Sequence, residues 1–359
     1  VGMVESPNLP WWKAMEGFWL VPGGGLEGGD LSWSGHWDWT RDEKQRAMLL
    51  KARDRGASVF ELFSNSPMWW MTRNKNPAGN DRKNCLDDNA APRLHASYLA
   101  TVAKKAATDH GIRFDSVEAM NEPSASWWSP SGTQEGCHLD RRAQALLLFE
   151  LRRALDATPG LQQVRVSGSD ENTYDEALES WEALQPASRQ TVGQINVHGY
   201  QQMDGAADSS RAALYRAAAK ANVPLWNSEY GEEDESGMSL AANLNQDLFL
   251  MHPTVWCYWQ FLDETVGWGL LRFDPDSATV LGPPPGKLFV MAHYSRHIRP
   301  GMTMLRTSAP DVVAAYDHQS SKLVLVVTTY LARRTTRIDL SNFESGGNGP
   351  ETGSNQGAG

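Results

Sequence analysis

The sequence predicts an α/β protein built as a (β/α)8 barrel, followed by a small C-terminal antiparallel β unit that need not be complete. Short apolar runs alternate with longer stretches of helical periodicity, which is typical of parallel strands joined by helices. Seven such strand–helix units can be counted, a number that favours a closed barrel over an open doubly wound sheet. The alternation stops after Arg299-Pro300-Gly301.

The strands of the barrel are expected to be short and apolar. They span residues 18–21, 58–63, 114–120, 164–168, 194–199, 224–228 and 255–260. An eighth strand is sought at 8–12, where the run is short and carries a proline, so the first unit is abbreviated.

Each strand is followed by a segment with helical periodicity. These helices are expected at residues 40–55, 92–109, 140–157, 174–184, 209–221, 238–251 and 287–296. Thr40 or Asp42 would begin the first of them, because such side chains accept hydrogen bonds from free backbone amides at a helix start.

The C-terminal part shows a different pattern. Residues 312–316, 323–329 and 336–340 alternate with period two and have no helices between them, which indicates antiparallel strands. We therefore divide the chain into a catalytic barrel at 1–300, the remnant of a β-sandwich-like side domain at 301–344 and a disordered Gly-, Ser- and Asn-rich tail at 345–359.

The composition narrows the classes of partner. The chain has 359 residues and a formal net charge of −10, and it contains no lysine- or arginine-rich run, which argues against nucleic-acid binding. No apolar run is long enough for a membrane span. A monomer acting on a neutral or acidic substrate is expected. The 15 tryptophans suit sugar binding, although a rich core is the simpler explanation.

The three cysteines give limited information. Cys85 and Cys137 both fall in loop-like sequence and could pair, which would imply an oxidising compartment. Cys257 lies in an apolar strand-like run and is expected to be a buried thiol. No two of the three have metal-ligand spacing. Residues 1–7 carry no signal-peptide pattern, so a leader is absent or already removed.

Two glutamates stand where a barrel places its chemistry. In parallel barrels the catalytic groups lie at the carboxyl ends of the strands. Glu122 and Glu229 occupy such ends, on strands 4 and 7 if the abbreviated unit is counted, and these strands face each other across the mouth. A glutamate at a strand end is more often a loop residue or a helix cap. Two on facing strands in aromatic surroundings favour glycoside hydrolysis, whose retaining form needs carboxyls about 5–5.5 Å apart.

Six more residues at or beyond strand ends are candidates for substrate binding: Asn65, Trp69, Asn121, His198, Tyr200 and Trp259. Asn121 can donate to the sugar beside the attacked carbon. His198 and Tyr200 could bond to the sugar or to Glu229, although a strand-end histidine can also simply hold a loop. Trp259 could form the floor of a sugar subsite or pack in the core.

Several polar and aromatic residues have two readings. Trp127 and Trp128 could flank a subsite or cover a loop, and Asp170 and Glu171 are candidates for a polar rim. The glycine run 23–28 matches a dinucleotide fingerprint, but no helix opens directly after it, so a glycine-rich barrel loop is favoured.

Two further pairs are expected to be structural. Glu61 and Glu118 are strand-interior carboxylates, for which pairing with a buried arginine or lysine is expected. His293 and His297 have metal-like spacing but no third ligand nearby, so we interpret them as surface or packing residues.

The motifs together resemble a known family. Asn121-Glu122-Pro123 and Ser228-Glu229-Tyr230-Gly231, with the runs 61–71, 196–200 and 294–301, look like glycoside hydrolase family 30 and, within it, the endo-β-1,6-galactanase branch. The resemblance implies a barrel flanked by a β-sandwich, Glu122 as acid/base, Glu229 as nucleophile and a secreted enzyme. The first barrel strands look shorter than in the family, which implies truncation at the N-terminal end.

Three hypotheses follow. The first is a retaining, endo-acting hydrolase of the β-1,6-galactan of arabinogalactan, which binds a polysaccharide or oligosaccharide. The second keeps the mechanism but changes the sugar to β-1,6-glucan, glucosylceramide or xylan. The third is an inactive or carbohydrate-binding fragment. Neither a metal nor an organic cofactor is expected, because both half-reactions need only carboxyls and water.

Overall fold

The computed structural model describes residues 17–18, 37–87, 90–201, 205–264, 267–274, 276–330 and 335–341. The expected strand at 8–12, the glycine run 23–28 and the tail at 345–359 lie outside these residues, as does most of the strand expected at 18–21.

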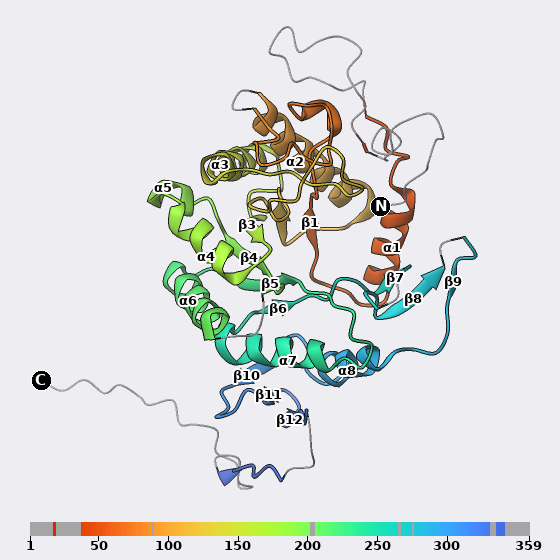
Figure 1. Ribbon diagram of the computed structural model, residues 1–359, viewed down its shortest axis with the longest axis vertical. Helices are drawn as coiled ribbons and strands as arrows, with labels where there is room; N and C mark the ends of the chain where they lie inside the picture. Colours follow the sequence, from red (N-terminus) through yellow and green to blue (C-terminus); the bar gives the residue numbers. More distant parts are fainter. Residues whose placement is uncertain are drawn as a thin grey trace, which may run out of the picture.

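A six-stranded parallel sheet forms the centre of the molecule, in the order β1-β2-β3-β4-β5-β6 (Figure 1). Its strands are β1 (Glu61–Phe63), β2 (Ser116–Glu118), β3 (Arg165–Glu171), β4 (Gln194–His198), β5 (Leu225–Glu229) and β6 (Val255–Trp256). Sequential neighbours pair in parallel throughout, as strand–helix–strand units require. The strands expected from residue 58 to residue 260 are confirmed; β1, β2, β4 and β6 are shorter than expected, β3 is longer and β5 is shifted by one residue.

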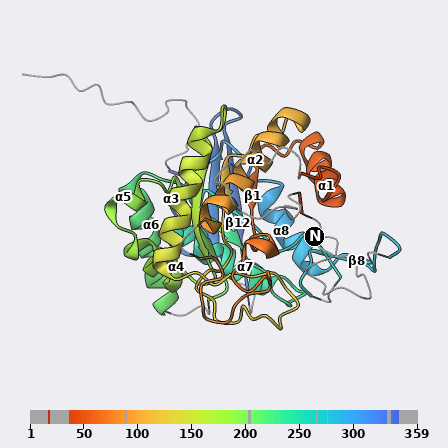
Figure 2. The same cartoon turned by 90° about the horizontal axis from the view of Figure 1, so that it is seen from above.

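Helices surround this sheet on its outer side, as Figures 1 and 2 show. They are α1 (Glu43–Asp54), α2 (Ala91–His110), α3 (Arg141–Ala157), α4 (Tyr174–Ala183), α5 (Pro186–Arg189), α6 (Gly205–Ala221), α7 (Met238–Gln246) and α8 (Gly286–Ser295). All seven expected helices are present. The one expected at 238–251 changes at Asp247 into a π-helix, η3 (Asp247–Met251). A 3-10 helix, η2 (Trp69–Met71), follows β1.

Side chains at the starts of two helices explain where those helices begin. Asp140 accepts a hydrogen bond from the backbone amide of Ala143 at the start of α3. Thr173 accepts one from the amide of Glu176 at the start of α4. Such caps satisfy amides that have no partner inside the helix, and each stabilises the helix by about 1 kcal/mol.

The main core lies between the sheet and the helices. Alternate strand residues such as Val117, Val166 and Ile195 point outward and are buried against apolar helix residues, among them Leu148 and Leu151 of α3. Burying each such side chain contributes about 1.5–3 kcal/mol. The intervening strand residues, including Glu118, therefore face the inner side of this half-barrel sheet, away from the helices.

Two smaller sheets complete the fold. β7 (Leu262–Asp263), β8 (Leu271–Asp274) and β9 (Thr279–Val280) form a sheet that the sequence did not predict, because its strands are too short for a periodic signal. β10 (Thr303–Leu305), β11 (Val312–Asp317) and β12 (Lys322–Val327) form an antiparallel C-terminal sheet. It packs through Val313 against α7 and α8.

The strand expected at 336–340 is wrong. Residues 335–340 form no strand. The third strand of this sheet is β10, which pairs with the central strand β11. Cys85 and Cys137 form the disulfide that the sequence allowed. Within the described part of the chain, no helix combines the length and apolar character needed to cross a lipid bilayer.

Candidate active site

Glu122 and Glu229 approach each other at the carboxyl ends of β2 and β5. Glu229 is the last residue of β5 and lies opposite His198 of β4. Glu122 lies four residues beyond β2, where its backbone amide donates to the carbonyl of Asp170, 2.8 Å away. Its φ of 44° is unusual for a non-glycine residue and turns the chain sharply after the strand. Glu122 is 6% exposed.

His198 lies between the two glutamates. Its Nδ1 is 3.0 Å from Oε1 of Glu122 and 3.5 Å from Oε1 of Glu229. One carboxylate oxygen of each glutamate and a ring nitrogen of His198 all lie within 4.8 Å of one another. This is the separation expected for retaining hydrolysis and is too short for the inverting arrangement, which leaves about 6.5–9.5 Å.

Each glutamate also receives a hydrogen bond from a neutral side chain. The Tyr200 hydroxyl donates to Oε1 of Glu229 at 3.0 Å. Asn172, just after β3, donates through Nδ2 to Oε1 of Glu122 at 2.6 Å. Donors that hold a carboxylate in one orientation reduce the reorganisation needed when it reacts.

Asp170 lies behind His198. Its Oδ2 is 3.2 Å from Nε2 of the histidine, and its Oδ1 accepts from the Ser228 hydroxyl at 2.6 Å. Burial by itself would lower the pKa of His198, but the charges of Glu229 and Asp170 outweigh it and raise that pKa well above its usual value. The ring is therefore a cation facing acidic groups.

The environment of Glu229 is poorly solvated. Burial raises the pKa of Glu229 to about 7, although the His198 charge and the Tyr200 hydrogen bond lower it, while Asp170 and Glu122 add to the rise. The charges of His198, Asp170 and Glu122 therefore all act on the ionisation of Glu229.

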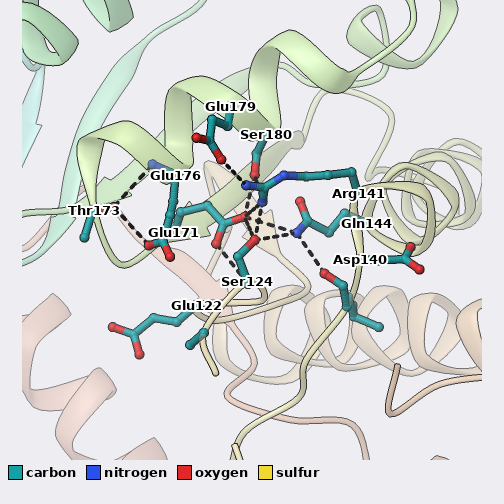
Figure 3. Close-up of polar contacts among 12 residues, drawn as sticks. Glu122, Ser124, Asp140, Arg141, Gln144, Glu171, Thr173, Glu176, Glu179 and Ser180 are labelled. Atoms are coloured by element: carbon teal, nitrogen blue, oxygen red, sulfur yellow. Dashed lines mark hydrogen bonds and ion pairs between the residues drawn. The ribbon is translucent and has the colours of Figure 1, made fainter. Parts of the chain in front are cut away.

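A separate cluster around Glu171 fixes the loop that carries Glu122 (Figure 3). Glu171 accepts from the backbone amide and hydroxyl of Ser124, at 3.0 and 2.8 Å. Arg141 of α3 pairs with Glu171 at 2.6 Å and also donates to the hydroxyls of Ser124 and Ser180. The Glu122 side chain points away from this cluster, which secures its backbone without engaging its carboxyl.

Among the six candidates for substrate binding, His198 and Tyr200 contact the glutamate pair directly. Asn121 is 4% exposed, and its Oδ1 has no hydrogen-bond partner among the described residues. Asn65, Trp69 and Trp259 line a cavity of about 920 Å³ beside β1. Neither Glu122 nor Glu229 is among the described residues that line it.

Two tryptophans after Glu122 differ from each other. Trp128 is 3% exposed and donates through its indole N–H to the carbonyl of Glu122 at 2.9 Å, which supports the loop. Trp127 is 52% exposed and contacts Trp128 edge-on. Of the two readings from the sequence, loop support describes Trp128, and only Trp127 is free to meet a sugar.

The sequence also missed an aromatic wall. Trp268, between β7 and β8, lies 6.2 Å from the Tyr200 ring, measured between centroids. Gly231, two residues after Glu229, has no room for a side chain, since a Cβ there would lie 2.8 Å from the Trp268 ring. Lys287 of α8, fully buried, donates to the carbonyls of Glu232 and Gly267 and so joins the loops that carry this wall.

A buried polar network lies behind β5, in the helix layer. Asp247, the first residue of η3, accepts from Arg211, Tyr174, Asn227 and Trp256 at 2.6–2.9 Å. Asn227 is two residues before Glu229, so this network anchors the outer side of the strand that ends at the candidate site.

The prediction of basic partners for Glu61 and Glu118 is wrong for the described chain. Glu61 accepts from neutral groups only, including Ser167, Gln194 and Asn196 at 2.8–2.9 Å. Within the described residues, neither carboxylate oxygen of Glu118 has a side-chain hydrogen-bond partner. Burial raises the pKa of Glu61 to about 7 and that of Glu118 well above 4.5, because it disfavours the charged form of a carboxyl that has no basic partner.

The remaining expectations from the sequence have mixed outcomes. Asp170 and Glu171 are buried rather than at a rim. His293 and His297 are both exposed, as expected. Asn172, Trp268 and Lys287 were not predicted. Only Asn172 gave a signal, because it closes a run of three polar residues at a strand end.

Comparisons with known proteins agree with this geometry. A model described as O-glycosyl hydrolase family 30 matches residues 27–181. An endo-β-1,6-galactanase of Hypocrea rufa is 44% identical over 350 residues, which cover 98% of this chain and 70% of the relative.

Solved structures show the same fold at low identity. SrfJ from Salmonella typhimurium superposes with a TM-score of 0.68 at 17% identity, covering 82% of this chain and 67% of that one. A family 30 endoxylanase from Clostridium papyrosolvens superposes with a TM-score of 0.55 at 14% identity, covering 77% and 66%. On the strength of the family match and the 44% identical relative, the chain belongs to O-glycosyl hydrolase family 30 and is a glycoside hydrolase.

Proposed function

We propose that this enzyme cleaves the β-1,6-galactan of arabinogalactan within the chain and with retention of configuration. The Hypocrea rufa relative, named an endo-β-1,6-galactanase and 44% identical, supports the substrate and the endo action. One observation carries the mechanism: carboxylate oxygens of Glu122 and Glu229 lie within 4.8 Å of each other at the ends of two parallel strands.

In the first step, an ionised Glu229 oxygen attacks the anomeric carbon of the galactosyl unit. The bond between that carbon and the O6 oxygen of the next unit breaks, and Glu122 gives its proton to O6. A covalent glycosyl-enzyme results. Tyr200, which donates to Glu229 at 3.0 Å, and the imidazolium of His198 lower the pKa of Glu229 against the effect of burial and so favour the ionised form that attacks.

In the second step, Glu122 acts as the base. It removes a proton from a water molecule, the water oxygen attacks the anomeric carbon from the face that the leaving group vacated, and Glu229 is released. Two inversions give net retention, and Glu122 regains its proton. Asn172 and the Glu171 cluster keep Glu122 in place for both steps.

The first experiment tests activity and the two glutamates together. Purified protein should release galacto-oligosaccharides of several lengths from de-arabinosylated arabinogalactan, and Glu229→Gln should lower kcat by about 10⁴-fold or more, as loss of a nucleophile does. Glu182→Gln, an exposed residue on α4, is the matched control and should keep full activity. Wild-type turnover by Glu229→Gln would remove Glu229 from the mechanism.

A second experiment separates the roles of Glu122 and Glu229. With an activated aryl β-galactoside and azide, Glu122→Ala should give the β-galactosyl azide, because azide attacks the glycosyl-enzyme. Glu229→Gly should give the α-galactosyl azide, because azide then takes the place of the missing nucleophile. Products of the opposite configuration in both variants would reverse the two assignments.

A panel of polysaccharides tests the sugar. Galactan should be cleaved faster than β-1,6-glucan, xylan or glucosylceramide, and a different order would keep the mechanism but replace the substrate. Sugar binding without turnover of any of them would instead identify a carbohydrate-binding protein.

We also propose that the enzyme is secreted, acts as a monomer and needs no cofactor. The Cys85–Cys137 disulfide supports an oxidising compartment, because such bonds persist mainly outside the cytosol. Analytical ultracentrifugation should give the mass of one chain, and dialysis against a chelator should leave activity unchanged.

A further inference from the structure

We propose that Glu122, His198 and Glu229 also form a binding site for a divalent transition-metal cation such as Zn²⁺, and that the bound metal blocks the enzyme competitively. The metal takes no part in the reaction. The blocking effect rests on the function proposed above, whereas the metal site itself rests only on the arrangement of the three side chains.

The spacing of the three donors is close to that of a metal-bound set. Zinc lies about 2.0–2.2 Å from histidine nitrogens and carboxylate oxygens, so neighbouring ligand atoms of a tetrahedral site are about 3.3–3.6 Å apart. Here Nδ1 of His198 is 3.0 Å from a Glu122 oxygen and 3.5 Å from a Glu229 oxygen, and all three donor atoms lie within 4.8 Å. Small side-chain rotations suffice to close the remaining distance.

The groups around these donors are those that metal sites use. A ligating histidine commonly directs its other ring nitrogen at a carboxylate, which fixes the ring. Nε2 of His198 faces Oδ2 of Asp170 at 3.2 Å. Each glutamate oxygen is held as well, by Asn172 for Glu122 and by Tyr200 for Glu229.

Charge and ligand type favour a transition metal. Glu122, Glu229 and Asp170 place three carboxyls around the single ring of His198, and in the part of the chain that the structure describes no lysine or arginine pairs with Glu122 or Glu229. A dication that displaces the Nδ1 proton of His198 adds one positive charge to this acidic site. Imidazole suits zinc, copper and nickel, whereas Mg²⁺ and Ca²⁺ need about six or more oxygen ligands. Three protein ligands leave the fourth position of a tetrahedral zinc site to a water molecule.

Metal and substrate then exclude each other. The sugar requires Glu229 free to attack and Glu122 free to carry a proton, and coordination by the same oxygens prevents both. The expected kinetic signature is a rise in KM for galactan with kcat unchanged at saturating substrate, and full reversal by a chelator.

Calorimetric titration of the tag-free enzyme with ZnCl₂, without substrate, tests the site. One tight site is expected, and His198→Asn and Glu122→Gln should each weaken it at least 10-fold. His293→Asn is the matched control, because exposed His293 and His297 lie four residues apart and form the alternative surface site. If His198→Asn is less well folded by circular dichroism, the nearly isosteric Glu122→Gln carries the test.

Inhibition is measured on the same preparations. Zn²⁺ should inhibit competitively, EDTA should restore the rate, and Mg²⁺ at the same concentration should have no effect. Equal Zn²⁺ affinity in wild type, His198→Asn and Glu122→Gln would overturn the site, and so would loss of binding in His293→Asn. Zn²⁺ binding through His198 with no turnover of galactan would refute the proposed substrate and leave the metal site standing.

Discussion

Two buried polar clusters lie on opposite faces of the six-stranded sheet, and they are built differently. On the outer face, Asp247 meets Arg211 and three neutral donors, so positive and negative charge balance. On the inner face, Glu61 and Glu118 have only neutral donors or none. His198 faces the carboxyls at the mouth.

The difference in charge balance indicates that the outer cluster stabilises the fold and that the inner cluster serves the chemistry of the site. A balanced pair that also has its hydrogen bonds is stable as long as both partners remain, and it ties η3 to β5. An unbalanced group of carboxyls responds to protons, metals and developing positive charge. Disrupting the outer cluster should therefore lower the free energy of unfolding. Disrupting the inner cluster should change the activity or the pH dependence of stability.

The largest effect on stability is expected at Asp247. Asp247→Ala removes the fully buried carboxylate that pairs with Arg211 and leaves it only the partly exposed Asp208, 3.3 Å away, which should lower the free energy of unfolding by about 3–5 kcal/mol. Urea denaturation followed by circular dichroism measures it. The double variant Arg211→Met with Asp247→Leu removes both charges and should recover part of the loss. A loss below about 1 kcal/mol for Asp247→Ala would contradict the assignment of this cluster to the fold.

Tyr200→Phe, a change at the mouth of the inner face, should lower activity without lowering stability, in contrast to Asp247→Ala. A hydrogen bond to a charged group contributes about 1.5–3 kcal/mol. Its loss at Glu229 should therefore lower kcat/KM by about 10–150-fold, with little change in unfolding free energy. Initial rates on β-1,6-galacto-oligosaccharides and a urea titration give the two values, and equal effects on both would erase the distinction.

The smallest effect, and the most specific, is expected from Glu118→Gln. The folded pKa of Glu118 is raised by burial. Its contribution to stability is thus fully present below pH 4.5, the ordinary value, and is lost as the pH rises toward the folded pKa. The variant should match wild type near pH 4 and become relatively more stable at pH 8. Exposed Glu182→Gln should show no such trend.

The main features of the site could be predicted from the sequence because strand ends are readable. Apolar runs locate the strands, parallel pairing places their ends at one mouth, and Glu122, Glu229, His198 and Tyr200 all lie there. Geometry of this kind needs only the order of elements and the position of each residue relative to a strand end.

Features that depend on local backbone turns or on distant contacts could not be predicted. Asp170 has a φ of 56°, and no pattern indicates that this turn directs it toward His198. Lys287 lies on α8 among apolar residues, and only the folded chain shows which loops it joins. The prediction of an arginine or lysine partner for Glu118 was wrong because periodicity indicates which face of the strand a residue lies on and not which residues surround it.

The bond between Cys85 and Cys137 also affects how the chain would respond to a protease. Glu122 precedes Cys137 and Glu229 follows it. Exposed Trp127 lies between Glu122 and Cys137 and marks an accessible stretch of chain there. A single cut there would place Glu122 and Glu229 on separate fragments. One covalent bridge between sulfur atoms would still hold the two fragments together.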